Sequence, residues 1–344
     1  MSFPDLIGES IQHIKVTLLF PKRVIIYRGI KMKKLIIGTL LLSLASSVFA
    51  LPNLLDKQEV TESSIKNLNF GLAWENLEIQ ETYGNTIDVE IYSNNRKASP
   101  RIKTSGSTLY IDSTSSFAIG TRCTVIVYIP QHKNFNEIEL KASSGEITVK
   151  TLLSAQKIFI TTSSGEIYSE QGLYADTIKL RASSGDIEAN NLDANDFTAE
   201  TSSGEILIKQ YTGSTGTLTA TSGEIEVNGF AAEYTSFKTT SGEIEVKQLD
   251  CDYFDAKSTS GEIYLELINA PLAKSSATST SGSINIILPK DASFEVASHS
   301  NSGTLKNKFT SNKFVPRDTY YEKINGGGPL LELSTTSGSI EVEY

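Results

Sequence analysis

The sequence predicts an all-β solenoid, in which short strands stack as successive rungs along one axis. The main observation is a phrase, Ser-Ser-Gly-Glu-Ile or a variant of it, whose ten glycines are Gly145, Gly165, Gly185, Gly204, Gly223, Gly242, Gly261, Gly282, Gly303 and Gly338. Successive glycines are 20, 20, 19, 19, 19, 19, 21, 21 and 35 residues apart. Repeats of this length over most of a chain are typical of stacked-repeat folds, so we expect rungs of 19–21 residues.

Two further observations favour strands over helices. Apolar and polar residues alternate on both sides of each glycine, with the period of two that places one face of a strand in a core. The chain has only 2 Met and 1 Trp and is rich in Ser, Thr, Gly, Ile and Glu, a composition that favours strands and turns. One such rung cannot bury its apolar face alone, so stacked rungs must bury one another.

Residues 1–50 are expected to be a leader and not part of the fold. Met32, Lys33 and Lys34 precede an apolar run at 35–44, and residues 45–50 offer a small-residue cleavage site ending at Ala50. This order predicts a signal peptide over 32–50 that is removed on export. The alternative, a membrane anchor, would need roughly 20 apolar residues, so we expect no transmembrane segment in the mature chain. Residues 1–31 have no place before a signal peptide, and we expect an upstream extension of the gene or, alternatively, an unusual leader.

Removal of the leader would leave a strongly acidic protein. The whole chain carries 31 Lys and Arg against 40 Asp and Glu, a net charge of −9. Residues 51–344 keep 24 basic and 38 acidic residues, a net charge of −14. Such a charge argues against nucleic acid or an anionic membrane surface as a partner and is compatible with cation binding.

The segment between the leader and the regular repeats is expected to be irregular. Residues 51–73 are interpreted as a polar lead-in, partly helical, and the repeat domain is expected to span 74–344. Strands with alternating apolar residues are expected at 77–79, 87–91, 109–111 and 123–130, as degenerate copies of the later unit. Pro130 would end the last of them, because proline cannot donate to a sheet ladder.

From Ile138 each unit is predicted to be a strand, a bend at Ser-Gly, a second strand and a return. Numbered from the glycine, positions −7, −5 and −3 are apolar or small and positions +2 and +4 are apolar; we expect them inside and the residues between them outside. The glycine is expected to adopt a positive φ or to allow close approach between rungs. The serine at −1, present in all ten copies, is expected to hydrogen-bond to the bend or to its equivalent one rung away.

Position +1 of seven repeats is acidic. In-register stacking would bring these carboxylates roughly 4.8 Å apart at the backbone, where each neighbouring pair repels by about 0.8 kcal/mol in water. Either the side chains spread into solvent, with salt and nearby lysines compensating, or divalent cations such as Ca²⁺ bind to them. No other metal and no cofactor is expected. The seven residues are Glu146, Glu166, Asp186, Glu205, Glu224, Glu243 and Glu262.

The long last spacing predicts a basic, aromatic loop or hairpin over 306–328, inserted before the final rung. Its residues Lys313, Arg317, Tyr320 and Tyr321 form a candidate partner-binding element, because the loop breaks the repeat. The alternative is an ordinary surface loop that caps the final rungs.

The two cysteines, Cys123 and Cys251, are expected to be unpaired and mostly buried. They lie about six repeats apart in the sequence, which corresponds to more than about 20 Å along the stack. A disulfide tolerates no more than about 7 Å between its Cα atoms.

An enzymatic site is not expected. Residues 51–344 contain two histidines, His132 and His299, far apart in the sequence, and nothing marks one serine as a nucleophile. The repeated carboxylates are evenly spaced, whereas a glycoside-cleaving site needs a local pair. We therefore keep a carbohydrate-active β-helix enzyme only as a third alternative.

The repeats also resemble a known family. The run of [Ser/Thr]-Ser-Gly-[Asp/Glu]-Ile units, the strand ending at Pro130, and the closing Gly-Gly-Pro-Leu-Leu-Glu-Leu-x-Thr-x-Ser-Gly-Ser-Ile are similar to the putative-adhesin family of bacterial β-strand-repeat proteins, which has no known function. The resemblance covers 74–344. It implies a right-handed β-solenoid, or single-stranded β-helix, at the cell envelope or outside the cell, and it implies no catalytic residue.

The leading hypothesis is therefore an exported, non-enzymatic binding or scaffold protein, adhesin-like, in the periplasm, at the cell surface or secreted. Its partner would be a cell-surface or envelope component, either a protein or a carbohydrate. The alternative hypothesis is an accessory protein of envelope stress or signalling that binds a peptide or an envelope component.

Overall fold

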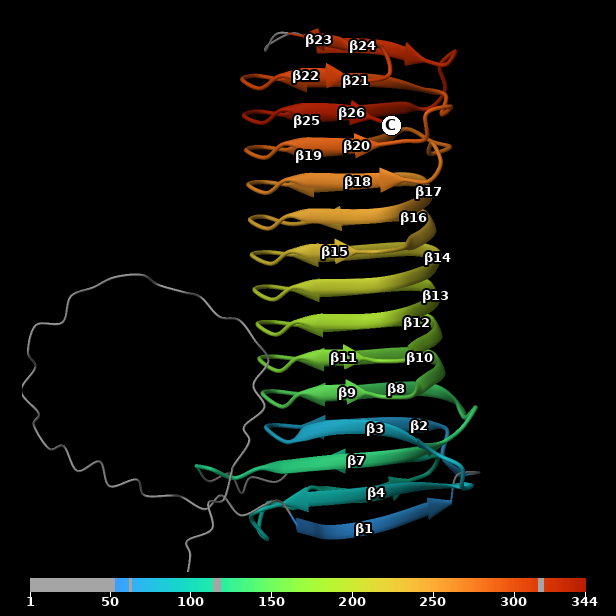
Figure 1. The fold of residues 1–344 in the computed structure, drawn as a ribbon. Helices are drawn as coiled ribbons and strands as arrows, with labels where there is room; N and C mark the ends of the chain where they lie inside the picture. Colours follow the sequence, from blue (N-terminus) through green and yellow to red (C-terminus); the bar gives the residue numbers. More distant parts are fainter. Residues whose placement is uncertain (1–52, 62–63, 114–118, 315–318) are drawn as a thin grey trace, which may run out of the picture. The chain divides into compact units, whose positions relative to one another are not determined.

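The computed structural model describes residues 53–61, 64–113, 119–314 and 319–344. Within these ranges the chain consists of strands joined by turns, and most strands lie parallel in a stack along one axis (Figure 1). The predicted all-β solenoid is confirmed, whereas its right-handed, single-stranded coil stays a prediction. The predicted leader, 1–50, lies outside the described residues.

The regular part of the stack begins at residue 134 and places equivalent positions of successive repeats side by side. Ile158 is paired with Ile138 on one side and Ile178 on the other, and Ile167 is paired in the same way with Ile147 and Ile187. The strands are β8 (Asn134–Ala142), β9 (Ile147–Val149), β10 (Leu152–Thr162), β11 (Ile167–Ser169), β12 (Gly172–Ala182), β13 (Ile187–Thr201), β14 (Ile206–Ala220), β15 (Ile225–Val227), β16 (Phe230–Lys238), β17 (Ile244–Ser258), β18 (Ile263–Leu267), β19 (Ser275–Ser279) and β20 (Ile284–Ile287).

At the amino-terminal end the stack does not follow chain order. β2 lies between β8 and β6, and β3 lies between β9 and β7, all in parallel. Antiparallel pairs of β7 with β4 and of β4 with β1 then close this end. The strands are β1 (Asn53–Thr61), β2 (Asn67–Leu72), β3 (Asn76–Thr82), β4 (Thr86–Ser93), β5 (Arg101–Ser105), β6 (Thr108–Asp112) and β7 (Cys123–Pro130). The partly helical lead-in over 51–73 was therefore a wrong prediction, because β1 and β2 occupy most of it.

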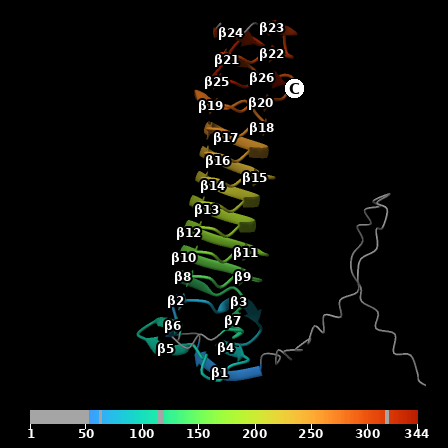
Figure 2. The ribbon, with the colours of Figure 1, turned by 90° about the vertical axis from the view of Figure 1, so that its left-hand side faces the viewer.

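The carboxyl-terminal end repeats this arrangement. β25 lies between β19 and β21, and β26 lies between β20 and β22. β23 and β24 pair antiparallel with β22 and β21 and close the stack (Figure 2). The last repeat in the sequence is therefore inside the stack and not at its end, contrary to the sequence-based expectation. The strands are β21 (Phe294–Ser300), β22 (Leu305–Asn307), β23 (Asn312–Phe314), β24 (Thr319–Ile324), β25 (Leu330–Thr335) and β26 (Ile340–Glu343).

The repeated glycines form a column in which each one packs on the backbone of the previous rung. A Cβ on Gly165 would lie 1.9 Å from the carbonyl oxygen of Gly145, and one on Gly223 would lie 1.6 Å from that of Gly204. None of the ten has a positive φ, since the positive-φ glycines of the described chain are elsewhere. Of the two predicted reasons for glycine, close approach between rungs is therefore the correct one.

The hydroxyls that bond to the column glycines lie at position −3, whereas of the predicted serines at −1 Ser302 bonds to the neighbouring bend, donating to the Thr336 carbonyl at 3.0 Å. Thr201 accepts a hydrogen bond from the backbone N–H of Gly204 at 3.0 Å and donates to the carbonyl of Gly185, one rung away, at 3.2 Å. Thr239 bridges Gly242 and Gly223 in the same way. These buried hydroxyls satisfy backbone groups that the turn leaves without a ladder partner.

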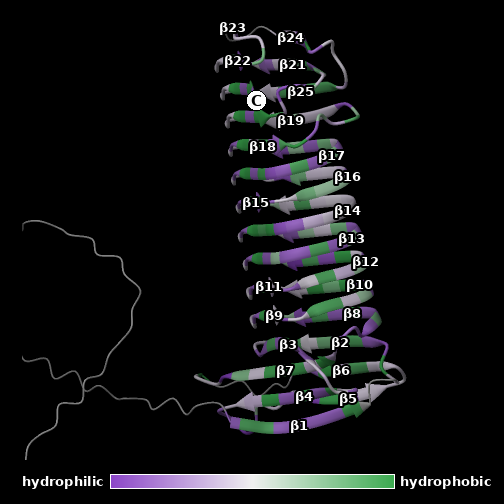
Figure 3. Cartoon of the chain, turned by 45° about the vertical axis from the view of Figure 1, so that its right-hand side comes forward, coloured by the Kyte–Doolittle hydropathy of each residue, from purple (hydrophilic) through white to green (hydrophobic). Residues whose placement is uncertain are grey.

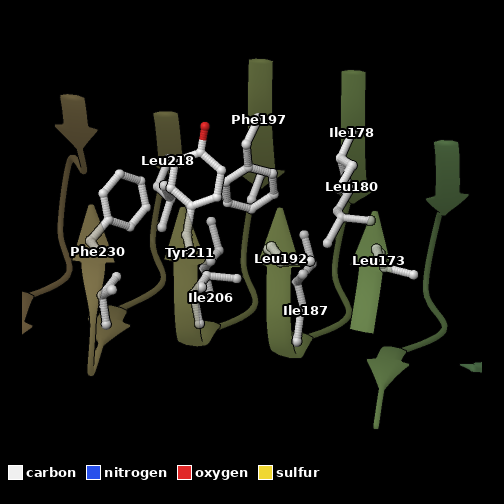
Figure 4. Packing of buried hydrophobic residues seen from close by; sticks show 14 of the residues in the cluster. Leu173, Ile178, Leu180, Ile187, Leu192, Phe197, Ile206, Tyr211, Leu218 and Phe230 are labelled. Atoms are coloured by element: carbon white, nitrogen blue, oxygen red, sulfur yellow. The ribbon is translucent and has the colours of Figure 1, made fainter. Parts of the chain in front are cut away.

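The core is a thin apolar layer between the two strands of each rung. In its middle, aromatic rings stack from rung to rung, with Phe197 and Tyr211 at 5.1 Å and Tyr211 and Phe230 at 4.6 Å between centroids (Figure 4). Two glycines outside the column leave room for these rings: a Cβ would lie 2.3 Å from the Tyr211 hydroxyl at Gly213 and 2.2 Å from the Phe230 ring at Gly216.

Both cysteines are buried free thiols, as predicted. Burial raises the pKa of each, Cys123 and Cys251, to about 12. Thiols protonated to that extent are poor nucleophiles and poor metal ligands.

Candidate interaction surfaces

The seven acidic residues at position +1 form one continuous line, which we call the acid edge (Glu146, Glu166, Asp186, Glu205, Glu224, Glu243 and Glu262). All seven are exposed. The backbone carbonyl of each one after Glu146 accepts a hydrogen bond from the isoleucine of the preceding rung, as in Glu166 with Ile147 at 2.9 Å. The expected in-register stacking of the carboxylates is thus present.

The stacking changes the electrostatics in the middle of the acid edge. Partial burial, followed by the charges of Asp186 and Glu224, raises the pKa of Glu205. Burial and the charges of Glu262 and Glu224 raise the pKa of Glu243 in the same way. These carboxylates therefore hold their protons more tightly in the fold than they would in an unfolded chain.

Lysines near the acid edge pair with the glutamates two residues after it, and not with the acid-edge carboxylates themselves. Lys209 pairs with Glu188 at 3.2 Å and Lys247 with Glu245 at 2.9 Å, both two residues after an acid-edge position. Among the residues that the structure describes, no three Asp, Glu, His or Cys side chains come together as a metal site. Cation binding by the acid edge stays a proposal to be tested.

A second surface lies on the other side of the glycine column and differs in charge. We call it the sheet face: the outward-facing residues at positions −8, −6 and −4 from the column glycine in β10, β12, β13, β14, β16, β17 and β19, where they alternate with buried residues. Figure 3 colours these strands by hydropathy. Five cations stand there against three anions, in a chain whose net charge is −9. The cations are Lys157, Lys179, Arg181, Lys238 and Lys257, and the anions are Asp196, Glu200 and Asp255.

Two shallow grooves lie on the sheet face. One, of about 380 Å³, is lined by Phe159, Lys179, Arg181, Thr198 and Glu200 among others. Within it the Lys179 ammonium lies 6.0 Å from the centre of the Phe159 ring, and Arg181 pairs with Glu200 at 3.6 Å.

The second groove, of about 300 Å³, lies over β14, β16, β17 and β19 and is lined mainly by threonines around Lys238 and Lys257. At the margin of the same strands stand two neighbouring tyrosines, Tyr234 on β16 and Tyr253 on β17. They are paired in register and their ring centroids are 6.2 Å apart. Tyr234 is 57% exposed.

The two tyrosines of the predicted carboxyl-terminal binding element differ in exposure. Tyr320 is buried, whereas Tyr321 is 52% exposed and bonds to Glu295. The described part of the segment pairs with β21 and β22 and covers the end of the stack, as the capping alternative expected. The Lys313 side chain and Arg317 lie outside the described residues, so a binding role for this element stays a prediction.

The two histidines of residues 51–344 lie toward opposite ends of the stack. His132 follows β7 and His299 is in β21. The structure thus does not bring them into one site.

The sheet face was not predicted from the sequence, because its residue types vary from repeat to repeat, whereas position +1 is acidic in seven repeats. Its signal was available: Tyr234 and Tyr253, like Lys238 and Lys257, are 19 residues apart. Aligned on the column glycines, they fall on one face of neighbouring strands. Their spacing is thus that of the repeat itself.

Comparison with known families agrees with this architecture. A family model described as Toastrack DUF4097 matches residues 65–175 and 170–343. No curated protein matches the chain. In the described part of the chain, no helix has the length and apolar character needed to cross a membrane.

Three solved structures are similar to the chain. A putative adhesin from Parabacteroides distasonis ATCC 8503 is 13% identical, with 83% of this chain and 96% of that one covered and a TM-score of 0.51. A putative adhesin from Parabacteroides merdae ATCC 43184 is 12% identical, with coverage of 83% and 95% and a TM-score of 0.45. A putative lipid binding protein from P. distasonis ATCC 8503 is 17% identical, with coverage of 85% and 97% and a TM-score of 0.41. At these identities the likeness concerns the fold alone.

Proposed function

The chain belongs to the Toastrack DUF4097 family, and from that premise we propose that it is an exported, non-enzymatic binding protein of the cell envelope or cell surface. The observation that carries the proposal is the sheet face. It is a broad, regular surface with an excess of cations on a strongly acidic chain, and it has two grooves lined by charged and hydroxyl side chains.

Rigidity supports a binding role. Each strand of the sheet face is paired on both sides in register, so its outward side chains are fixed at the spacing of the rungs. Binding to a surface that is already ordered avoids much of the entropic cost of association. Such a face can hold an extended partner along the stack without rearranging, which is what an adhesin-like or scaffold protein requires.

Segregation of charge supports the same role. The acid edge keeps anionic partners away from the turns, while the sheet face, with its excess of cations, remains accessible to them. Surfaces of opposite charge that lie side by side, such as the acid edge and the sheet face, determine the orientation of a bound partner more than they increase its affinity. The expected partner is thus an anionic protein or carbohydrate of the envelope or of another cell surface, and not the anionic lipid surface that the net charge of the chain disfavours.

The test combines location with binding. The tagged full chain is expressed in a bacterium, and protease accessibility on intact cells is compared with that in lysed cells. Purified chain is then mixed with envelope fractions, and a variant with Arg181→Ser and Lys238→Ser is compared with Lys209→Ser, whose lysine pairs with Glu188 outside the sheet face. We expect export and binding that only the first variant weakens; a cytoplasmic chain, or equal binding by all, would contradict the proposal.

A further inference from the structure

Resting on the proposed function, we propose that the sheet face over β14, β16, β17 and β19 binds an extended saccharide that carries an acidic group. Two independent observations meet there: the pair of exposed Tyr234 and partly buried Tyr253, and the groove around Lys238 and Lys257. All four side chains point away from the core, so neither the tyrosine pair nor the two lysines are needed to fill it.

The tyrosine pair supplies the apolar part of such a site. Tyr234 and Tyr253 come from neighbouring strands in register, so the two rings stand one rung apart on one margin of the face. An exposed aromatic ring offers a flat apolar surface with a hydroxyl at its rim. The C–H face of a sugar ring has the matching character, apolar across its centre and polar around its edge. A saccharide that runs parallel to the strands, from the tyrosine pair to the groove, can therefore place one sugar unit against the two rings.

The groove supplies hydrogen bonds and charge. Around the two lysines it is lined by Thr219, Thr221, Thr240, Thr259 and Thr278, and each hydroxyl can both donate and accept, as sugar hydroxyls can. Lys257 pairs with Asp255 at 2.5 Å. Lys238 is exposed and makes no ion pair with any residue that the structure describes. One ammonium group is therefore available for a carboxylate, phosphate or sulfate on the ligand.

The distance between the two parts sets the size of the ligand. Tyr253 and Lys257 are four residues apart on β17, which corresponds to roughly 13 Å along a strand. This is longer than one sugar ring, so an oligosaccharide is required to reach both. Between them lies Asp255, whose carboxylate accepts from the Ser276 hydroxyl at 2.7 Å and is half-buried, in reach of a sugar hydroxyl.

The chain's charge favours a saccharide over nucleic acid. A nucleic acid brings one phosphate for every nucleotide, and its affinity depends on several cations that neutralise them. The site offers one unpaired lysine, close to Asp255, on a chain with a net charge of −9. Sparse acidic groups separated by neutral hydroxyl-rich units fit that arrangement better.

The experiment uses the purified full chain and an array of oligosaccharides bearing uronate, sialate, phosphate or sulfate groups, each beside its neutral counterpart, together with a single-stranded oligothymidylate. The variants are Tyr234→Ser with Tyr253→Ser, and Lys238→Gln. Leu272→Ser is the matched control, because Leu272 is 75% exposed on the loop before β19. Circular dichroism and thermal unfolding establish that each variant is folded.

We expect at least one acidic oligosaccharide to bind. The tyrosine variant should weaken it at least 10-fold, Lys238→Gln should weaken the acidic ligand more than its neutral counterpart, and Leu272→Ser should leave both unchanged. The inference is overturned if the tyrosine variant binds every acidic saccharide as tightly as the parent does. It is also overturned if the tyrosine variant weakens binding of the oligothymidylate alone. Envelope binding that survives the tyrosine variant would overturn this site while leaving the proposed function in place. Saccharide binding by a chain that is not exported would overturn the proposed function while leaving this site in place.

Discussion

Gly338 packs directly on Gly282, although 56 residues separate them in the sequence. A Cβ on Gly338 would lie 2.0 Å from the carbonyl oxygen of Gly282, and one on Gly303 would lie 1.8 Å from that of Gly338. The last repeat of the chain therefore separates two repeats that are consecutive in the sequence. After β20 the chain first builds the end of the stack with β21 to β24. It then returns, and β25 and β26 insert between β19 and β20 on one side and β21 and β22 on the other.

Removal of residues 329–344 should accordingly do more than shorten the stack by one rung. β21 and β22 would lose their parallel partners, while β19 and β20 would each lose one of two and keep β17 and β18. Hydrogen exchange measured on the shortened chain should show loss of protection throughout 275–324, together with a lower melting temperature. Protection retained at β21 and β22 would mean that they can pair directly with β19 and β20, and would contradict this account.

The sequence was informative wherever one repeat follows the next. The glycine spacing and the alternation of apolar residues are sufficient to place Ile138, Ile158 and Ile178 in register, because a one-residue slip would turn every buried side chain outward. The same alternation says nothing about which rung a strand pairs with. Leu331 and Leu333 would be equally buried at the end of the stack or inside it, so the insertion of β25 could not be predicted.

The acid edge and the sheet face also differ in how far the sequence alone predicts them. The acid edge could be predicted because its residues follow an easily recognised glycine. The pairing of Lys257 with Asp255, which leaves Lys238 as the unpaired one of the two lysines in the threonine-lined groove, depends on side-chain positions within the sheet face. Likewise, Leu68 and Phe70 alternate with polar residues as in later strands, but no repeat phrase adjoins β2 to mark it as part of the stack.

Gly204→Ala should destabilise the fold strongly. The new Cβ would lie 2.0 Å from the carbonyl oxygen of Gly185, and that backbone cannot move without breaking the rung below. We expect the free energy of unfolding to fall by about 3 kcal/mol, the upper range for overpacking. Urea unfolding measures the change. Gly71→Ala is the control, because nothing lies within 4 Å of its Cβ position, and a similar loss in both variants would refute the glycine column as the cause.

Thr201→Val should cost about 2 kcal/mol, because it keeps the shape of the side chain and removes the hydroxyl that joins Gly204 to Gly185. Two buried backbone groups would then lack a partner. Thr201→Ser retains the hydroxyl and should lose less than half as much, while Thr219→Val, on the partly exposed sheet face, should be nearly neutral. Equal effects of valine and serine at 201 would show that packing, and not the hydrogen bonds, is responsible.

Glu205→Gln should stabilise the protein at neutral pH. The pKa of Glu205 is raised by burial and by Asp186 and Glu224, so the folded state binds the proton more tightly than the unfolded one. The ionised carboxylate therefore costs stability above the raised pKa, and this cost disappears as the pH falls below about 4.5, the ordinary value. Urea unfolding of variant and parent at pH 4, 5, 6 and 7 should show a difference that grows with pH.

Only the difference between variant and parent is diagnostic in that experiment. Hydrogen bonds from Lys308 lower the pKa of Glu341 and Glu343 at the carboxyl-terminal end, so their contribution to stability is lost in acid and affects both proteins alike. Glu233→Gln removes an exposed carboxylate outside the acid edge and serves as the charge-matched control. A stabilisation by Glu233→Gln as large as that by Glu205→Gln would point to net charge in place of local repulsion.

Calcium should add nothing to the effect of ionic strength on the acid edge. Its seven carboxylates are exposed and follow one another at one per rung, whereas Ca²⁺ takes 6–8 oxygen ligands around one centre. Sodium chloride should raise the melting temperature because it screens their repulsion, and millimolar CaCl₂ at matched ionic strength should raise it no further. A larger rise with calcium, abolished by Glu205→Gln with Glu224→Gln but not by Glu233→Gln, would instead establish a cation site on this edge.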